Sequence, residues 1–176
     1  MGRPWIAFFS QTGSEIEKIA THLNRWPDVI ITNKRPDGVR TITESVKLRA
    51  IEIPNKPTLE EYMSCLIWHE NPIVTLHGWL RIIPPRICDE FDVYNGHPGL
   101  ITKYPELKGK DPQMRAWNGD YSTYGTVIHK VSEGVDEGEI INTASFTADM
   151  LDIDGYFRIL NKMSQTLWID FLRGKI

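Results

Sequence analysis

The chain has 176 residues, of which 20 are Lys or Arg and 23 are Asp or Glu, so its formal net charge is −3. A chain of this length buries a core without disulfides, and it predicts a single domain over residues 1–176. The negative charge argues against binding to a nucleic acid polymer, which needs an excess of cations. No apolar run approaches the ~20 residues of a membrane span, so no membrane association is expected.

Two further features indicate the compartment. Cys65 and Cys88 each stand among apolar residues, which favours buried thiols in a reducing environment over a disulfide framework. The N-terminal sequence MGRPWIAFF is too short for a signal peptide. We therefore expect a cytoplasmic protein, and an oligomer is compatible with this sequence.

The first predicted elements are a strand, a turn and a helix. Trp5–Phe9 is a short apolar run, and apolar residues then recur at helical spacing from Ile16 to Leu23. The stretch Ser14-Glu15-Ile16-Glu17 has the pattern of a capping box, so we expect it to begin the helix. Further strands are predicted at Val29–Thr32 and at Lys47–Ile53.

The rest of the chain continues the alternation of strands and helices. A capping box at Thr58-Leu59-Glu60-Glu61 predicts a second helix, Ile73–Leu76 a buried strand, and Asp154–Arg173 a last helix. This alternation predicts an α/β fold of the three-layer, Rossmann-like kind, with a mostly parallel sheet. Since only seven residues separate Gly125–Val131 from Glu139–Ala148, we expect these two strands to form an antiparallel C-terminal extension.

Asn95 and His97 stand at the end of the apolar run that begins at Val93. Ligands of parallel sheets bind beyond the carboxyl ends of the strands, and alternate side chains of a strand share a face. Asn95 and His97 can therefore converge on one ligand atom, with Gly96 leaving room for it. An amide N–H can donate to a developing oxyanion, and an imidazole can donate beside it or exchange a proton. Judged from this tripeptide alone, structural roles in the turn are the favoured explanation of both residues.

Two loops carry further candidate residues. Asp136, in the loop Ser132–Gly138, can pair with His97 and raise its pKa, or accept a proton, although a plain acidic loop explains the composition equally well. The turn Ser10–Ser14 leads into a helix N-terminus and is a candidate anion site, but it lacks the spacing of dinucleotide-binding loops and the lysine of P-loops.

The sequence allows a site for a small anion but does not indicate a metal site. Cations gather within residues 31–49, at Lys34, Arg35, Arg40, Lys47 and Arg49, where they hold a small anion or form a solvated face. The five histidines are dispersed without the spacing of metal ligands, so no metal site is expected.

Five stretches together resemble the folate-dependent formyltransferase family, in family order and over most of the chain. They are FFSQTGSEIEKI, VIITNKRPD, LHGWLRIIPPRI, YNGHPGLI and GTVIHKVSEGVDEGEII. The resemblance implies the formyltransferase fold, with 10-formyltetrahydrofolate as donor and a primary amine as acceptor, by default glycinamide ribonucleotide of purine biosynthesis. Asn95, His97 and Asp136 match the family's catalytic triad. This likeness favours catalytic roles over structural ones.

The resemblance also implies the binding segments. The folate would lie against Leu80, Arg81, Ile82 and Ile83 and against Ser132, Glu133, Gly134 and Val135. The phosphate of a phosphorylated acceptor would lie at Gln11, Thr12, Gly13 and Ser14.

Three departures from the family bear on the acceptor. Gln11 replaces a glycine, His77 stands where a small residue is common, and KDPQMRAW after Gly109 replaces a segment with histidine. The acceptor amine therefore also has other candidates, namely a nucleotide-linked amino sugar or an aminomethylated nucleobase or nucleotide. A hydrolase that passes the formyl group to water, and a folate-binding module without catalysis, are the alternatives of another class.

Overall fold

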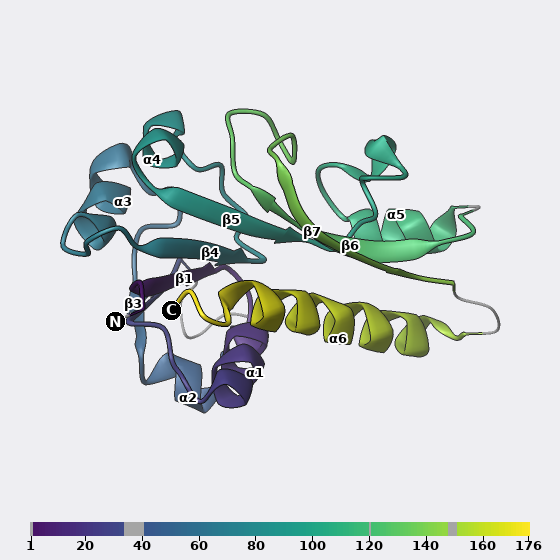
Figure 1. Cartoon of the computed structure of the whole chain (residues 1–176), viewed down its shortest axis with the longest axis horizontal. Helices are drawn as coiled ribbons and strands as arrows, with labels where there is room; N and C mark the ends of the chain where they lie inside the picture. Colours follow the sequence, from purple (N-terminus) through teal and green to yellow (C-terminus); the bar gives the residue numbers. More distant parts are fainter. Residues whose placement is uncertain (1, 34–40, 120, 148–150) are drawn as a thin grey trace.

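A seven-stranded sheet forms the centre of the computed structural model, which describes residues 2–33, 41–119, 121–147 and 151–176 (Figure 1). The strands lie in the order β3-β2-β1-β4-β5-β6-β7. Neighbours from β3 to β5 are parallel, whereas β6 and β7 are antiparallel, which confirms the predicted sheet. The strands are β1 (Trp5–Phe9), β2 (Val29–Thr32), β3 (Ala50–Glu52), β4 (Ile73–His77), β5 (Asp92–His97), β6 (Tyr124–Lys130) and β7 (Ile140–Phe146).

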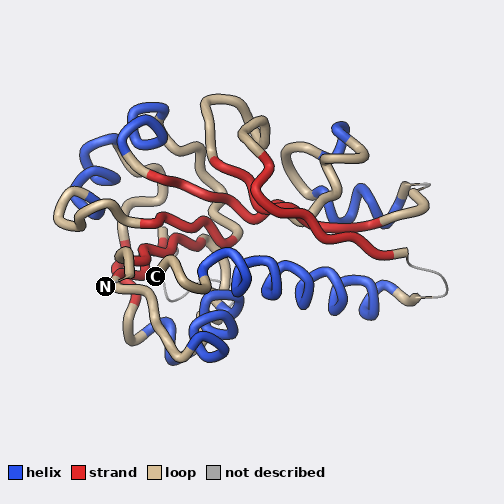
Figure 2. The backbone as a smooth tube through the Cα atoms, in the orientation of Figure 1, coloured by secondary structure: helices blue, strands red, loops and turns tan. Residues whose placement is uncertain are grey.

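Helices cover both faces of this sheet, as Figures 1 and 2 show. They are α1 (Ser14–Leu23), α2 (Glu44–Lys47), α3 (Leu59–Leu66), α4 (Pro85–Glu90), α5 (Pro112–Asn118) and α6 (Ile153–Leu172), with the 3-10 helix η1 (Pro105–Leu107). Helices α1 and α6 pack on one face, and α3 and α4 on the other. Within the described ranges, no helix is both long enough and apolar enough to cross a membrane.

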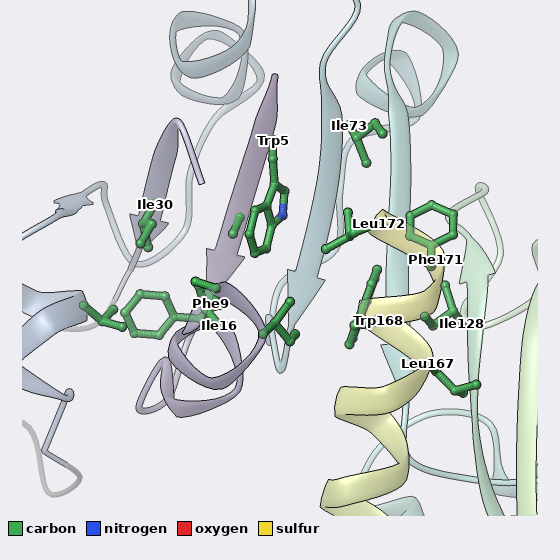
Figure 3. Packing of buried hydrophobic residues seen from close by; sticks show 14 of the residues in the cluster. Trp5, Phe9, Ile16, Ile30, Ile73, Ile128, Leu167, Trp168, Phe171 and Leu172 are labelled. Carbon is green, nitrogen blue, oxygen red and sulfur yellow. The ribbon is translucent and has the colours of Figure 1, made fainter. Parts of the chain in front are cut away.

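Strand β1 shows how the sequence builds two cores from one strand. Trp5, Ala7 and Phe9 pack with α1 and α6, whereas Ile6 and Phe8 pack with α3 and α4. All five side chains are buried, because successive side chains of a strand point to opposite faces and both faces are covered. Figure 3 shows the first of these cores, in which Trp168 of α6 lies against His77 of β4 and Gly96 of β5.

Two local predictions are wrong. The segment predicted as a strand at Lys47–Ile53 contains the end of α2, and only Ala50–Glu52 forms strand β3, a short edge strand. Helix α1 is not capped by Ser14. Its N-cap is Gly13, which adopts the left-handed conformation at φ 72° and makes no side-chain cap. A Cβ at Gly13 would lie 2.7 Å from the Val46 side chain, so close packing of α2 requires glycine here.

The remaining expectations have mixed outcomes. Cys65 and Cys88 are free and only partly buried, and burial raises the pKa of both thiols. Their packing against the α3 and α4 core supports structural roles. Lys34, Arg35 and Arg40 of the predicted cationic segment, and Ala148 of the last predicted strand, lie outside the described residues.

Candidate active site

The three predicted catalytic residues lie together, although they come from β5 and from the loop between β6 and β7. One carboxylate oxygen of Asp136, Oδ2, lies 3.2 Å from Nδ1 of His97. The other, Oδ1, accepts a hydrogen bond from the Asn95 amide at 3.4 Å. The side chains of His97 and Asp136 are 5% and 10% exposed, so a charge at either group meets little solvent screening.

A fourth residue, His129 of β6, completes this cluster, and the sequence analysis did not assign it. Its Nε2 lies 3.1 Å from the Asn95 amide nitrogen and 3.2 Å from Oδ1 of Asp136. Its Nδ1 faces the carbonyl of Lys130 at 3.1 Å and therefore carries the hydrogen. Nε2 then accepts from Asn95, which orients the amide. Only the register between β5 and β6 points to His129, because it pairs Asn95 directly with His129 across the antiparallel strands.

Gly96 and Gly99 both leave room for protein side chains, whereas Gly96 was expected to leave room for a ligand. Gly96 points to the opposite face of the sheet from Asn95 and His97, where a Cβ would lie 2.8 Å from Nε1 of Trp168. It therefore leaves room for the indole of α6 and not for a ligand, as the two-residue period of a strand requires. Gly99 instead makes room for the His97 ring, because a Cβ there would lie 3.0 Å from Nε2 of His97.

Asp136 is held by backbone as well as by side chains. It lies in the left-handed region at φ 53°, which Asp tolerates better than most residues. Oδ2 accepts a hydrogen bond of 2.8 Å from the Gly109 amide. Burial opposes ionisation of the carboxyl group, but the contacts with His129 and His97 and the Gly109 N–H outweigh it and lower its pKa. Asp136 is therefore a carboxylate at neutral pH.

His97 has an imidazole with two fixed partners. Nε2 donates to the carbonyl of Leu107 at 2.9 Å, so the hydrogen resides on that nitrogen and Nδ1 faces Asp136. Burial lowers the pKa of His97, and the opposing effects of Asp136 and the Leu107 carbonyl do not cancel it. Asp136 does raise the pKa of His97, as expected, but burial lowers this pKa by more. A neutral ring beside a carboxylate is suited to accept a proton at Nδ1.

The predicted folate segments flank this cluster along the chain. Leu80 and Ile82, in the loop after β4, are 58% and 79% exposed, and Val135, next to Asp136, is 57% exposed, whereas Ile83 is buried in the core. Arg81 is turned toward Asn55, to whose carbonyl its Nε donates. A hollow of about 310 Å³ lies between α4 and the β6–β7 loop, and Ser132 and Glu133 of the predicted segment line it. Leu80, Ile82 and Val135 do not line this hollow, so the part of these segments in folate binding stays a prediction.

The predicted acceptor turn, Gln11–Ser14, lies at the carboxyl end of β1, two strands from β5. The Leu80 amide donates to Ser10 Oγ at 3.0 Å, which ties this turn to the predicted folate loop. Next to the turn, Glu15 accepts a hydrogen bond from Ser164 Oγ at 2.6 Å. The part of this turn in binding the acceptor stays a prediction.

His77, which departs from the family pattern, is a bound side chain within the fold. Its Nδ1 lies 2.8 Å from Glu15 Oε2 and its Nε2 lies 2.9 Å from Thr75 Oγ1. Burial opposes ionisation of Glu15, but the hydrogen bond and charge of His77 outweigh it, so the pKa of Glu15 is lowered. This pair places a carboxylate within the first turn of α1. In the described part of the chain, no group of three His, Cys, Asp or Glu residues is arranged to hold a metal ion.

Comparison with known proteins relates most of the chain to one family. The family model described as formyl transferase matches residues 6–154. The methionyl-tRNA formyltransferase of Bifidobacterium longum (strain NCC 2705) is 30% identical over 151 residues, which are 78% of this chain and 44% of that protein. The phosphoribosylglycinamide formyltransferase of Bacillus subtilis (strain 168) is 25% identical over 163 residues, which are 85% of this chain and 82% of that protein. The chain thus spans less than half the length of its methionyl-tRNA formyltransferase relative.

Solved structures share the same fold. The phosphoribosylglycinamide formyltransferase of Streptococcus pneumoniae TIGR4 matches with a TM-score of 0.77 at 19% identity, over 97% of both chains. Glycinamide ribonucleotide transformylase 1 of Geobacillus kaustophilus matches with a TM-score of 0.80 at 18% identity, over 98% of both chains. A formyltetrahydrofolate deformylase of Pseudomonas syringae matches with a TM-score of 0.75 at 19% identity, over 97% of this chain and 60% of that one. These likenesses confirm the predicted formyltransferase fold.

Proposed function

Because the chain belongs to the formyl transferase family, we propose that it transfers a formyl group from 10-formyltetrahydrofolate to a primary amine, with glycinamide ribonucleotide as the default acceptor. One observation carries this proposal. Asn95, His97 and Asp136 come from segments 41 residues apart and meet at distances of 3.2–3.4 Å in a largely buried site.

The proposed reaction forms one C–N bond and breaks another. The amine nitrogen attacks the formyl carbon, the bond from that carbon to N10 of the folate breaks, the amine loses a proton and N10 gains one. Asn95 donates an N–H to the formyl oxygen as negative charge develops there. Its present contact with Asp136 is long, at 3.4 Å, so the formyl oxygen competes for this N–H at small cost.

His97 and Asp136 manage the proton in this proposal. The neutral ring of His97 accepts the amine proton at Nδ1, since Nε2 is bound to the Leu107 carbonyl. The Asp136 carboxylate, 3.2 Å from Nδ1, stabilises the imidazolium that results. This division of roles follows the lowered pKa of both groups. It replaces the alternative in which His97 stays charged and donates to the oxyanion.

An assay of tetrahydrofolate release tests the proposal. The donor is 10-formyltetrahydrofolate, and the acceptors are glycinamide ribonucleotide, a nucleotide-linked amino sugar, an aminomethylated nucleotide and no amine. We expect amine-dependent release, and a loss of about 10²–10³-fold in kcat for Asn95→Ala, for His97→Ala and for Asp136→Ala. Arg86→Met, which removes a surface arginine paired with Glu90, serves as the control that keeps full activity.

Each contrary result has a distinct meaning. Release without any amine would indicate a hydrolase, and binding of the folate without release would indicate a non-catalytic module. Full turnover by the three alanine variants would refute the assigned site. Methionyl-tRNA is also tested, because relatives of that name match the chain, and the net charge of −3 predicts no turnover with it.

A further inference from the structure

Arg115 of α5 donates hydrogen bonds to three consecutive backbone carbonyls of the segment that precedes its helix. Its Nη1 donates to the carbonyl of Glu106 at 2.7 Å, and its Nη2 donates to those of Leu107 at 3.1 Å and Lys108 at 2.6 Å. Within the described ranges Arg115 makes no ion pair with a carboxylate. Its guanidinium therefore binds backbone, for which a planar group with several fixed donors is well suited and a lysine ammonium is not.

The same segment, residues 106–109, also forms hydrogen bonds with both His97 and Asp136. The Leu107 carbonyl, which accepts from Arg115, also accepts from Nε2 of His97 at 2.9 Å. Two residues later, the Gly109 amide donates to Oδ2 of Asp136 at 2.8 Å. Residues 107–109 thus contact the ring nitrogen and the carboxylate of the pair from one side, and Arg115 contacts the two carbonyls closest to these bonds.

We propose that Arg115 is a positioning residue for formyl transfer, which holds residues 106–109 so that the Leu107 carbonyl and the Gly109 amide orient His97 and Asp136 toward each other. This inference rests on the proposed function. The sequence offers it no support by itself, because Arg115 stands in the segment KDPQMRAW that departs from the family pattern.

The bond to Leu107 has a chemical consequence at the opposite ring nitrogen. A carbonyl only accepts, so an anchored Leu107 keeps the hydrogen on Nε2 and leaves Nδ1 to exchange the proton. The charged or titratable groups that face His97 are Asp136 from the β6–β7 loop, His129 from β6 and Arg115 from α5. If residues 106–109 were free to move, the ring would sample the other tautomer and the Asp136 carboxylate would lose the Gly109 N–H.

Three variants separate the effect of the Arg115 hydrogen bonds from the effect of its charge. Arg115→Met removes both, Arg115→Lys keeps the charge but cannot span three carbonyls, and Arg86→Met controls for the loss of a surface arginine. Thermal unfolding first establishes that each variant is folded. We expect Arg115→Met and Arg115→Lys each to lower kcat by about 10- to 100-fold with little change in the KM for the folate, because small misplacements of reacting groups have effects of this size.

A second readout does not depend on turnover. With ¹⁵N-labelled histidine, NMR shifts of His97 should report the Nε2–H tautomer in the wild type and in Arg86→Met, and a mixture of tautomers in both Arg115 variants. If Arg115→Lys restores kcat fully, only the charge matters and the positioning role is refuted. An unchanged tautomer in Arg115→Met refutes it as well, even if the wild type shows no transfer, so that failure of the inference is distinguishable from failure of the proposed function.

Discussion

Burial and hydrogen bonding act in opposite directions on the imidazole of His97. Its side chain is 5% exposed, which disfavours the charged form, while Asp136 at 3.2 Å and the Leu107 carbonyl at 2.9 Å favour it. Burial is the larger effect, so the pKa of His97 lies below its ordinary value. At Asp136, burial opposes ionisation, but the contacts with His129 and His97 and the Gly109 N–H outweigh it and lower the pKa of the carboxyl group. A neutral base beside a carboxylate results.

These shifts predict how stability depends on pH. The unfolded chain protonates His97 near its ordinary pKa of about 6.5, before the folded protein does, so this contribution is present above that pH and is lost as the pH falls through the folded pKa. The contribution of Asp136 is present above its ordinary pKa of about 3.9 and is lost in stronger acid. Urea unfolding between pH 8 and pH 5 measures the first loss. His97→Gln should show a shallower slope in this window, and identical slopes would contradict the buried neutral ring.

His129 is expected to affect catalysis through the groups that it orients. His129→Phe leaves the Asn95 amide without its acceptor at 3.1 Å and removes a neighbour of Asp136. We expect kcat to fall by about 10- to 100-fold, since loss of a buried partner of a charged or polar group costs about 1.5–3 kcal/mol. His129→Gln, which keeps an acceptor, should recover part of this loss. His22→Ala, at an exposed position of α1, is the matched control, and an equal effect of both changes on kcat would refute the role.

The elements differ in how their ends are stabilised. Helix α3 has a complete capping box, in which Thr58 accepts from the Glu61 amide and Glu61 accepts from the Thr58 amide. Helix α1 begins instead at left-handed Gly13, and the hydroxyl of Ser14 accepts from Thr12 Oγ1 without capping the helix. The Ser14 amide itself donates to Thr12 Oγ1 at 3.3 Å, so ligand binding at this turn stays a prediction.

This contrast predicts unequal effects of two similar substitutions. Thr58→Ala should lower the free energy of unfolding by about 1 kcal/mol, the usual value of an N-cap. Ser14→Ala should lower it by less than about 0.5 kcal/mol, as at most surface positions. Urea unfolding of both variants provides the comparison. A loss at Ser14 equal to that at Thr58 would show that the serine caps α1 after all.

At the scale of the molecule, the order of strands assembles the site. Strand β6 returns antiparallel beside β5, which pairs Asn95 with His129, and the loop that follows brings Asp136 back to the end of β5 (Figure 1). The hollow between α4 and the same loop is lined by Ser132 and Glu133 of the second predicted folate segment. The donor therefore has a proposed place between two segments that are about 50 residues apart in sequence.

A donor analogue should stabilise the whole fold. A non-transferable formylfolate analogue at 100 times its Kd adds about 2.7 kcal/mol, which raises the Tm of a chain of this size by roughly 5–10 °C. Val135→Asp, in the predicted folate loop, should reduce this shift, whereas Leu48→Asp, at another exposed apolar residue, should not. No shift at any concentration, or an equal shift in both variants, would contradict the proposed folate site.

The sequence by itself determined the fold class and three of the four clustered residues. Buried strands and amphipathic helices have strong local periods, and resemblance to a family singled out Asn95, His97 and Asp136. Tertiary structure decided the rest, because it depends on contacts between distant segments. The register of β5 and β6 places His129 beside Asn95, the packing of Trp168 explains Gly96, and the fold of residues 106–115 brings Arg115 to the carbonyl that binds His97. Local sequence patterns contain no information on such pairings, so the direction of the His97 pKa was also decided only by burial.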